Sequence, residues 1–464
     1  MALRFKNSLT RRVEEFHPIE SGSVRMYTCG PTVYNFAHIG NFRAYMFEDL
    51  LRRYLKYKGY RVTQVMNLTD IDDKIIRESN ARGVTTKEFT KPYVDAFFAD
   101  MDTLGIERAE YYPAATDHIP EMVAIVKELE KRGHVYQVNG NYYFKIASFP
   151  DYGKLANLDM QGLKPGARIA ADEYEKDSVS DFALWKAWDE ADGIAFWETE
   201  IGKGRPGWHL ECSAMSMKYL GKRFDIHTGG VDNMFPHHEN EIAQSEGATG
   251  EKFVNVWLHC EHLIVEGKKM SKSLGNFYTL RDIIERGYPG LAVRYLLIAT
   301  HYRQQLNFTF DGLDGARAAL DRYNDFIDNV KLYPGGSSDG SAQTVIDKAK
   351  AGFEENLDDD LNISGALGIV FDLIRDINKL KAEERLSVAE RDAVLELMSR
   401  FDTVLGFQKK AVGLDAEIEA MIQKRQEARK AKDFALSDKI RNDLLTQGVV
   451  LEDTPQGVKW KRKV

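Results

Sequence analysis

Short apolar runs alternate with helical patterns along the first half of the chain. Residues 24–29 form an apolar run ended by a Gly-Pro pair, residues 37–58 carry a helical pattern, and a second apolar run spans 61–66. This order of strand, helix and strand is typical of a parallel sheet covered by helices. In such sheets ligands bind beyond the carboxyl ends of the strands, where we expect Cys29 and residues 67–70.

Amphipathic helices dominate the chain after Phe310. Apolar residues recur there at steps of three and four, which predicts helices with one buried face. The stripe comprises Leu313, Ala316, Leu320, Tyr323, Ile327 and Val330, and it returns at Leu367, Val370, Ile374 and Ile377. A Gly- and Ser-rich loop at 333–340 separates the two stretches. Basic helical segments at 418–445 and a strand-like run at 449–451 end the chain.

These patterns predict an α/β protein with several domains, as 464 residues also favour. We expect a Rossmann-type parallel-sheet catalytic domain split by an insertion, then a helical bundle and a small C-terminal mixed α/β domain. The predicted boundaries are 1–119 and 225–310 for the two halves of the sheet domain, 120–224 for the insertion, 311–412 for the bundle and 413–464 for the last domain. The insertion is the least regular part, because aromatic residues, glycines and charges mix there without a clean period.

Composition places the chain among soluble globular proteins. Apolar residues make up 43% and charged residues 29%, which permits a large buried core. No run of eighteen apolar residues occurs, and the first residues lack the pattern of a secretory signal. We therefore expect a cytoplasmic protein with no membrane partner. Three cysteines are too few for a disulfide framework, so we expect any special role for them to be metal or thiol chemistry.

The net charge of −8 argues against a chain that grips nucleic acid along its whole surface. The charge is unevenly spread, however. Residues 418–464 contain eleven Lys and Arg against seven Asp and Glu. A basic end on an acidic body can still meet RNA locally.

Residues 38–41, His-Ile-Gly-Asn, lie between the first predicted strand and helix. A His beside a Gly at a helix N-terminus lets phosphates approach the backbone, where unpaired N–H groups and the helix dipole favour negative charge. His38 would donate a hydrogen bond to a transferring phosphate. By itself the short pattern favours a simpler interpretation, a His that caps its own helix.

A second short segment, residues 267–273, has the sequence Gly-Lys-Lys-Met-Ser-Lys-Ser. Clustered ammonium groups on a loop, here Lys269 and Lys272, can neutralise a departing pyrophosphate during nucleotidyl transfer. A solvated basic loop is the alternative, and the segment alone does not exclude it.

Together and in this order, the two segments resemble the signature sequences of class I aminoacyl-tRNA synthetases, and in particular those of the cysteinyl-tRNA synthetase family. Other segments that look like that family are 67–74 (NLTDIDDK), 207–213 (GWHLECS), 235–241 (FPHHENE) and 451–457 (LEDTPQG). The similarity extends over nearly the whole chain. It implies a monomeric, ATP-dependent ligase that attaches L-cysteine to tRNA(Cys) through a cysteinyl-adenylate, with Mg²⁺ accompanying ATP. The bundle and the basic end would hold the RNA.

The resemblance also assigns roles to individual residues. It implies catalytic roles for His38, Lys269 and Lys272, an ATP site with His38, Gly40, Gly229, Gly230, Asp232 and Lys272, and a cysteine pocket with Cys29, Thr69 and Trp208. Absent side chains at the two glycines after Thr228 would admit the nucleotide, and Asp232 would accept from a ribose hydroxyl. The chain departs from the family at two positions: Thr228 stands where a third glycine is common, and Asn41 where other class I enzymes carry a second histidine.

A zinc site is the third expectation. His237 and Glu241 are four apart, so on a helix they project from one face, and Cys212 and Cys29 can join them from other segments. Spacing alone leaves His238 open as a ligand; the family resemblance assigns His237. We expect one Zn²⁺ per chain and leave Cys260, in the strand-like run 254–260, as a core residue. The alternative is that the cysteines are small buried hydrophobes and the histidines ordinary helix residues.

Such a metal has a clear chemical use. Cysteine differs from serine only by sulfur for oxygen, which a shape-based pocket discriminates poorly. Zinc binds thiolate well and lowers its pKa, whereas a serine hydroxyl coordinates it poorly. Discrimination by the metal also needs no hydrolytic editing domain, and no additional insertion of domain size is evident in the sequence.

Two other functions compete with this one. An enzyme of the same ancestry that joins cysteine to an amino sugar would keep the zinc and ATP chemistry, but it has no use for the region after residue 310. A catalytically silent RNA-binding protein on a synthetase scaffold would have no need of residues 38–41, 267–273 and four metal ligands.

Overall fold

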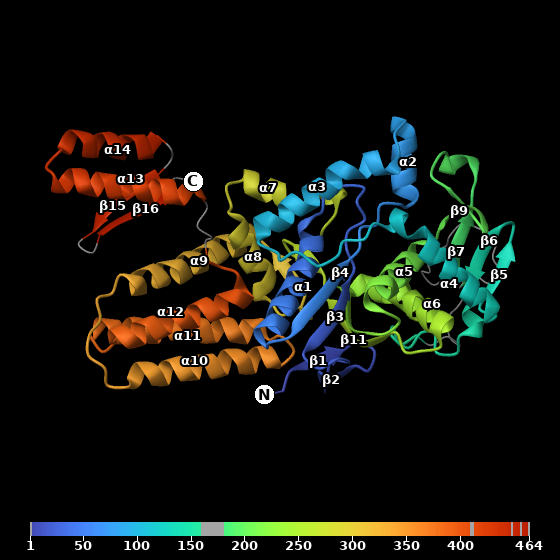
Figure 1. Cartoon of the computed structure of the whole chain (residues 1–464), viewed down its shortest axis with the longest axis horizontal. Coiled ribbons are helices and arrows are strands. Elements are labelled where there is room, and N and C mark those ends of the chain that lie inside the picture. The colour runs from blue at the N-terminus through green and yellow to red at the C-terminus, as the bar shows by residue number, and fades with distance from the viewer. Residues whose placement is uncertain (1, 159–180, 409–412, 447–448, 455–456, 463–464) are drawn as a thin grey trace.

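The computed structural model describes residues 2–158, 181–408, 413–446, 449–454 and 457–462 (Figure 1). Part of the predicted insertion, 159–180, and part of the C-terminal family-like segment, 455–456, lie outside the described residues. No helix in the described part is long and apolar enough to cross a membrane.

A parallel sheet of four strands forms the centre of the molecule. Its order is β11-β10-β3-β4, with bounds Val254–Cys260 (β11), Phe224–Gly230 (β10), Ser23–Thr28 (β3) and Arg61–Met66 (β4). All three pairings are parallel, and Thr28 lies opposite Thr228. The sheet therefore joins strands from before and after the insertion, and the predicted Rossmann-type α/β fold is confirmed. The carboxyl ends of β3 and β10 meet at one edge.

Helices cover both faces of this sheet, so its strands are buried on both sides. Side chains along β3 alternate: Val24 and Met26 belong to the core shared with α1 (Ile39–Tyr57), whereas Tyr27, and Cys29 directly after the strand, belong to the core on the opposite face. That second core is shared with α4 (Ile119–Lys131), α5 (Trp208–Leu220) and α6 (Glu239–Thr249). Helices α2 (Asp73–Arg82) and α3 (Thr86–Leu104) follow β4 in the chain.

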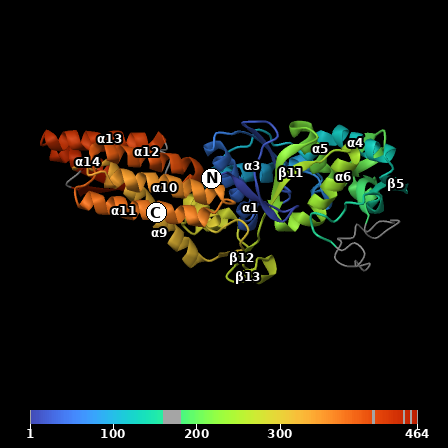
Figure 2. The same ribbon diagram turned by 90° about the horizontal axis from the view of Figure 1, so that it is seen from below.

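The irregular part of the sequence folds into an antiparallel sheet of five strands. Its order is β5-β6-β7-β9-β8, with bounds Val135–Val138, Asn141–Phe144, Phe182–Ala187, Gly202–Pro206 and Trp197–Thr199. Figures 1 and 2 both place β5 of this sheet and the bundle helices at opposite ends of the molecule, with the parallel sheet between them.

Smaller elements surround the parallel sheet. Strands β1 (Arg4–Asn7) and β2 (Arg12–Glu15) form an antiparallel pair. A three-stranded sheet has the order β13 (Lys268–Lys269), β12 (Leu263–Val265) and β14 (Leu306–Phe308), and the lysine-rich segment begins in it. Helices α7 (Leu280–Glu285) and α8 (Gly290–Ala299) lie between β13 and β14 in the chain.

Four long helices form the predicted bundle: α9 (Phe310–Lys331), α10 (Ser341–Asp358), α11 (Ile363–Ala382) and α12 (Val388–Leu405). Every apolar residue of the predicted stripes in α9 and α11 is buried. Helices α13 (Gly413–Lys430) and α14 (Phe434–Thr446) then pack with the antiparallel hairpin β15 (Val449–Thr454) and β16 (Gly457–Arg462). Residues such as Ile418, Ile440 and Leu451 form the small core of this last unit.

Candidate metal and nucleotide site

Residues from three separate parts of the chain converge beyond the carboxyl ends of β3 and β10. Cys29 directly follows β3, and its N–H donates to the Thr228 carbonyl of β10 at 3.2 Å. Cys212 lies on α5 and Glu241 in the first turn of α6. His237 belongs to a separate helical turn, Met234–His238, that runs directly into α6. The sheet register thus brings residues from distant parts of the chain into one buried site.

The four predicted zinc ligands lie together. One ligand atom from each of Cys29, Cys212, His237 and Glu241 is within 4.8 Å of all the others, and all four residues are buried. Two sulfurs, one imidazole and one carboxylate are a donor set that suits zinc. Glu241 Oε1 lies 3.1 Å from His237 Nε2, yet in the described residues it has no hydrogen bond of acceptable geometry. A cation bound between Glu241 Oε1 and His237 Nε2 would give each of these atoms a partner.

The charge state of the cluster also favours a cation. A hydrogen bond with Cys29 is the main cause that lowers the pKa of Cys212, to about 6. Burial raises the pKa of Glu241, but the surrounding His227 and His237 outweigh it and bring the value down to about 2. A thiolate and a carboxylate are therefore available at neutral pH. Burial lowers the pKa of His237, but Cys212 and Glu241 outweigh it and raise the value to about 10, so the His237 ring must release a proton when a metal binds.

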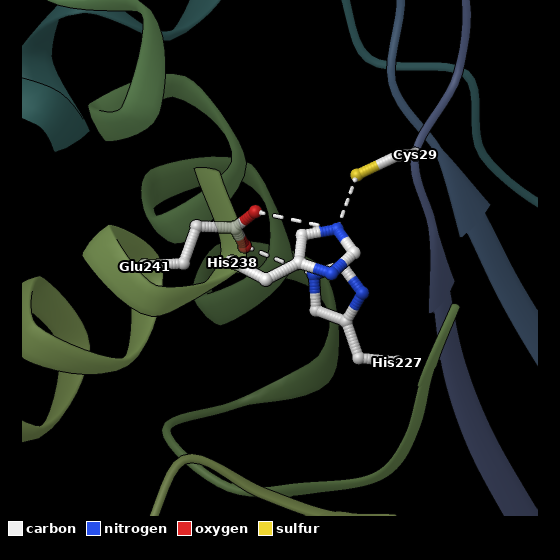
Figure 3. A group of neighbouring side chains, drawn as sticks. All are labelled: Cys29, His227, His238 and Glu241. Atoms are coloured by element: carbon white, nitrogen blue, oxygen red, sulfur yellow. Dashed lines mark hydrogen bonds and ion pairs between the residues drawn. The ribbon is translucent and has the colours of Figure 1, made fainter. Parts of the chain in front are cut away.

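A second set of four residues overlaps the first. Cys29, His227, His238 and Glu241 also offer ligand atoms within 4.8 Å of one another (Figure 3). His238 Nε2 lies 3.2 Å from Cys29 Sγ, and His227 Nε2 lies 2.9 Å from Glu241 Oε2. The alternative that sequence spacing left open for His238 therefore persists in the geometry.

Histidines also occupy the positions behind both sets. His209 Nδ1 lies 2.9 Å from His237 Nδ1, and His259 Nε2 lies 2.8 Å from His238 Nδ1. Each pair engages the outer ring nitrogen and leaves Nε2 directed at the cluster, so that the outer histidine can orient the inner ring as partners behind a metal-bound histidine do. Burial lowers the pKa of His238 well below its ordinary value, with His227 and His259 adding to the effect. Sequence inspection missed His209, His227 and His259 because isolated histidines in different elements carry no spacing signal.

The predicted pocket residues flank the cluster. Trp208 stacks on His237 with ring centroids 4.2 Å apart, and 44% of its surface remains exposed, so it lies at the rim. Thr69 is buried and donates to Glu211 at 3.1 Å, next to Cys212 in the chain. Backbone hydrogen bonds between Thr69 and the loop after β3 hold this segment beside Cys29.

Two of the predicted nucleotide residues, His38 and Gly40, lie at the start of α1. His38 is the N-cap of α1, as the simpler interpretation of the motif proposed: the Asn41 N–H donates to His38 Nδ1 at 3.2 Å, and Asn41 Oδ1 accepts from the His38 N–H at 3.1 Å. Burial lowers the pKa of His38, and the nearby Asp232 opposes this only in part. The neutral ring accepts at Nδ1, so its proton resides on Nε2.

Close packing explains the glycines. A Cβ on Gly40 would lie 3.0 Å from the His38 ring and 3.1 Å from the Met270 side chain. A Cβ on Gly229 would lie 2.7 Å from the His238 ring. Gly230 ends β10, and Asp232 follows it in a short helical turn.

The lysine-rich segment is joined to the same helix start. The Ile39 N–H donates to the Tyr278 carbonyl at 3.0 Å, and Phe277 contacts the His38 ring edge-on. Lys272 lies 5.3 Å above the Phe277 ring, and both Lys269 and Lys272 are exposed. Residues 38–41 and 267–273, far apart in the chain, thus border one site.

Comparison with protein-family models supplies the deciding observation. Residues 15–318 match the catalytic domain of class I (C) tRNA synthetases, 352–409 match the DALR domain, and 411–460 match the cysteinyl-tRNA ligase anticodon-binding domain. The chain is 52% identical to the cysteine–tRNA ligase of Protochlamydia amoebophila, over 99% of this chain and 98% of that protein. It is 53% identical to that of Brachyspira hyodysenteriae, over 99% of each. The chain belongs to the cysteine–tRNA ligase family.

Membership makes this chain a class I aminoacyl-tRNA synthetase, as the two short motifs predicted. Solved structures of other members of that class share its fold. A methionyl-tRNA synthetase from Mycobacterium tuberculosis in complex with methionyl-adenylate aligns with a TM-score of 0.61 at 15% identity, over 83% of this chain and 90% of that one. The leucyl enzyme of Agrobacterium radiobacter, in a ternary complex with tRNA, aligns with a TM-score of 0.62 at 12% identity, over 84% of this chain and 85% of that one.

Proposed function

We propose that this cysteine–tRNA ligase joins L-cysteine to tRNA(Cys) in two steps, with a bound zinc ion selecting the amino acid. In the first step the cysteine carboxylate attacks the α-phosphate of ATP, which is bound with Mg²⁺, and gives cysteinyl-adenylate and pyrophosphate. In the second, the terminal ribose hydroxyl of the tRNA attacks the carbonyl carbon of the adenylate and takes the acyl group, and AMP leaves. The observation that carries the proposal is the convergence of Cys29, Cys212, His237 and Glu241 within 4.8 Å of one another.

We assign the zinc to this set and leave His238 as a neighbour. This set contains two sulfur donors, whereas the alternative set with His227 and His238 contains one. Sulfur is a soft donor that zinc binds well. When bound, zinc supplies a Lewis acid that holds a thiolate strongly and a serine hydroxyl weakly. Neighbouring residues position the His237 ring: His209 orients it, and Trp208 stacks on it at the rim of the site.

The ATP site would lie between the start of α1 and the end of β10. Gly40, Gly229 and Gly230 present backbone in place of side chains, and Asp232 is suited to accept from a ribose hydroxyl. The His38 ring, neutral and protonated at Nε2, would donate a hydrogen bond to the α-phosphate as negative charge develops there.

Lys269 and Lys272 would neutralise the departing pyrophosphate. Both residues are exposed in a segment that is joined to the His38 turn, so they can reach a phosphate chain extending outward from that turn. Their task is electrostatic, and neither step of the reaction needs a protein nucleophile.

We further propose that the bundle and the C-terminal unit hold the tRNA and that the enzyme acts as a monomer. The C-terminal unit would bind the anticodon, in keeping with the family model that it matches. The predicted domain division at 119, 224, 310 and 412 remains part of this proposal. The basic excess in residues 418–464 suits a phosphate backbone.

One experiment tests the function against its rivals. Purified protein should exchange pyrophosphate into ATP only when cysteine is present, should reject serine, and should charge tRNA(Cys). Exchange without charging, together with ligation of cysteine to an amino sugar, would favour the amino-sugar ligase. Tight tRNA binding without any exchange would mean a silent scaffold and would overturn the proposal.

A further inference from the structure

Helix α1 carries a carboxyl group into the core beneath β10. Glu48 is fully buried, as is Thr228, and the Thr228 hydroxyl donates to Glu48 Oε1 at 2.9 Å. Glu48 Oε2 is buried as well and has no hydrogen-bond partner among the described residues. Burial raises the pKa of Glu48 to about 8, so the group is neutral at ordinary pH.

Packing of α1 against the core does not by itself require a polar pair at this position. The neighbouring α1 residues that face the core, Phe42, Tyr45, Met46 and Leu50, pack as apolar side chains do. Burying a carboxyl group with one hydrogen bond costs free energy relative to an apolar residue of similar size. What a buried polar pair supplies instead is a defined register, because the hydrogen bond forms in one relative position of the two elements.

The two elements that this bond joins carry opposite sides of the nucleotide site. Helix α1 begins at the His38 cap and Gly40, and as a rigid rod it transmits any sliding at Glu48 to its first turn. Thr228 directly precedes Gly229 and Gly230 on β10. Two other polar side chains of α1, Arg43 and Asp49, bind α8, so these contacts do not join α1 to β10.

We propose that Glu48 and Thr228 are positioning residues that set the His38 turn relative to the glycines of β10, and thereby shape the ATP site. This inference rests on the proposed function of that site. Neither side chain contacts the reacting atoms. The Cys29 N–H donates to the backbone carbonyl of Thr228, which a side-chain substitution keeps, so the expected effect is on ATP binding and not on the zinc set.

The test uses matched pairs of variants in cysteine-dependent pyrophosphate exchange. Thr228→Val keeps the shape and removes the hydroxyl, whereas Thr228→Ser keeps the hydroxyl. Glu48→Met removes the acceptor, whereas Glu48→Gln keeps it. Loss of one buried hydrogen bond should raise the KM for ATP about tenfold in Thr228→Val and Glu48→Met. The KM for cysteine and the zinc content should stay at wild-type values, and Thr228→Ser and Glu48→Gln should restore the KM for ATP to within about twofold.

Two results would overturn the proposal. One is an unchanged KM for ATP in Thr228→Val or Glu48→Met; the other is an equal rise in both KM values together with a lower melting temperature, which marks general loosening. If Thr228→Val does not fold, Glu48→Met against Glu48→Gln gives the same comparison. Absence of exchange in the wild-type protein would instead contradict the proposed function, so the two failures are distinguishable.

Discussion

Arg294 of α8 and Asp49 of α1 form a fully buried ion pair, with Nη2 2.7 Å from Oδ2. The same guanidinium donates to the carbonyls of Leu405, at the end of α12, and Leu104, at the end of α3. One side chain therefore joins the helix that begins at His38 to the last helix of the bundle. Cationic groups suit these positions because the C-terminal carbonyls of helices carry partial negative charge.

Arg294→Met should destabilise the protein by about 3 kcal/mol, because it leaves the Asp49 charge and two buried carbonyls short of a partner. Chemical denaturation followed by circular dichroism measures the change. The matched control is Arg375→Met, which breaks an exposed ion pair with Asp372 on α11 and should change the stability far less, because solvent screens that pair. Equal effects of the two substitutions would contradict the role of Arg294.

The buried carboxyl of Glu48 predicts a pH dependence of stability. Its pKa rises from an ordinary 4.5 to about 8 on folding, so the folded state holds the proton more tightly than the unfolded chain. The stability from this group is complete below about pH 4.5 and is lost as the pH rises through about 8. The loss has a slope of up to about 1.4 kcal/mol per pH unit.

Denaturation of the wild type and of Glu48→Gln from pH 5 to 9 measures this term. The groups that face Glu48 are Tyr45, Cys29 and Cys260, and the pKa of each is raised, by burial for Tyr45 and Cys260 and by a hydrogen bond with Cys212 and burial for Cys29, so they keep their protons over this range. Wild type should lose stability relative to the variant as the pH rises. A difference that does not vary with pH would show that Glu48 does not titrate in this range.

Cysteine substitutions test the metal site. Cys212→Ser should reduce the zinc content from about one ion per chain to near zero and abolish cysteine-dependent exchange, because a serine hydroxyl is a poor zinc ligand. Cys260→Ser is the control, because Cys260 is also buried but lies at the end of β11 outside both candidate sets. Atomic absorption measures the zinc. Retention of zinc in Cys212→Ser, or its loss in Cys260→Ser, would refute the assignment.

Replacement of His38 tests the phosphate contact. Asn is a favourable N-cap, so His38→Asn should keep the start of α1 while it removes the imidazole donor. We expect cysteine-dependent exchange to slow by about a hundredfold, the usual loss for one transition-state hydrogen bond. Zinc content should not change, and His262→Ala, at an exposed histidine, should exchange at the wild-type rate. An exchange rate in His38→Asn close to wild type would contradict the proposed contact.

Local patterns of the sequence determined the individual elements. The runs at 24–29 and 61–66 and the helical stripe at 313–330 became β3, β4 and α9, because the period of apolar residues depends only on near neighbours and on burial of one face or both. Cys260 is a core residue, as predicted. The short strands of the five-stranded antiparallel sheet could not be predicted, because three to six residues of mixed character show no period.

The site was decided only by tertiary structure. Residue types and a family resemblance named Cys29, Cys212, His237 and Glu241, but their approach depends on the parallel register of β3 with β10 and on the packing of α5 and α6 against that sheet. The histidines behind the cluster and the Glu48–Thr228 bond had no counterpart in the sequence patterns. Each joins residues from elements far apart along the chain, and a contact of that kind exists only once the sheet and its covering helices have assembled.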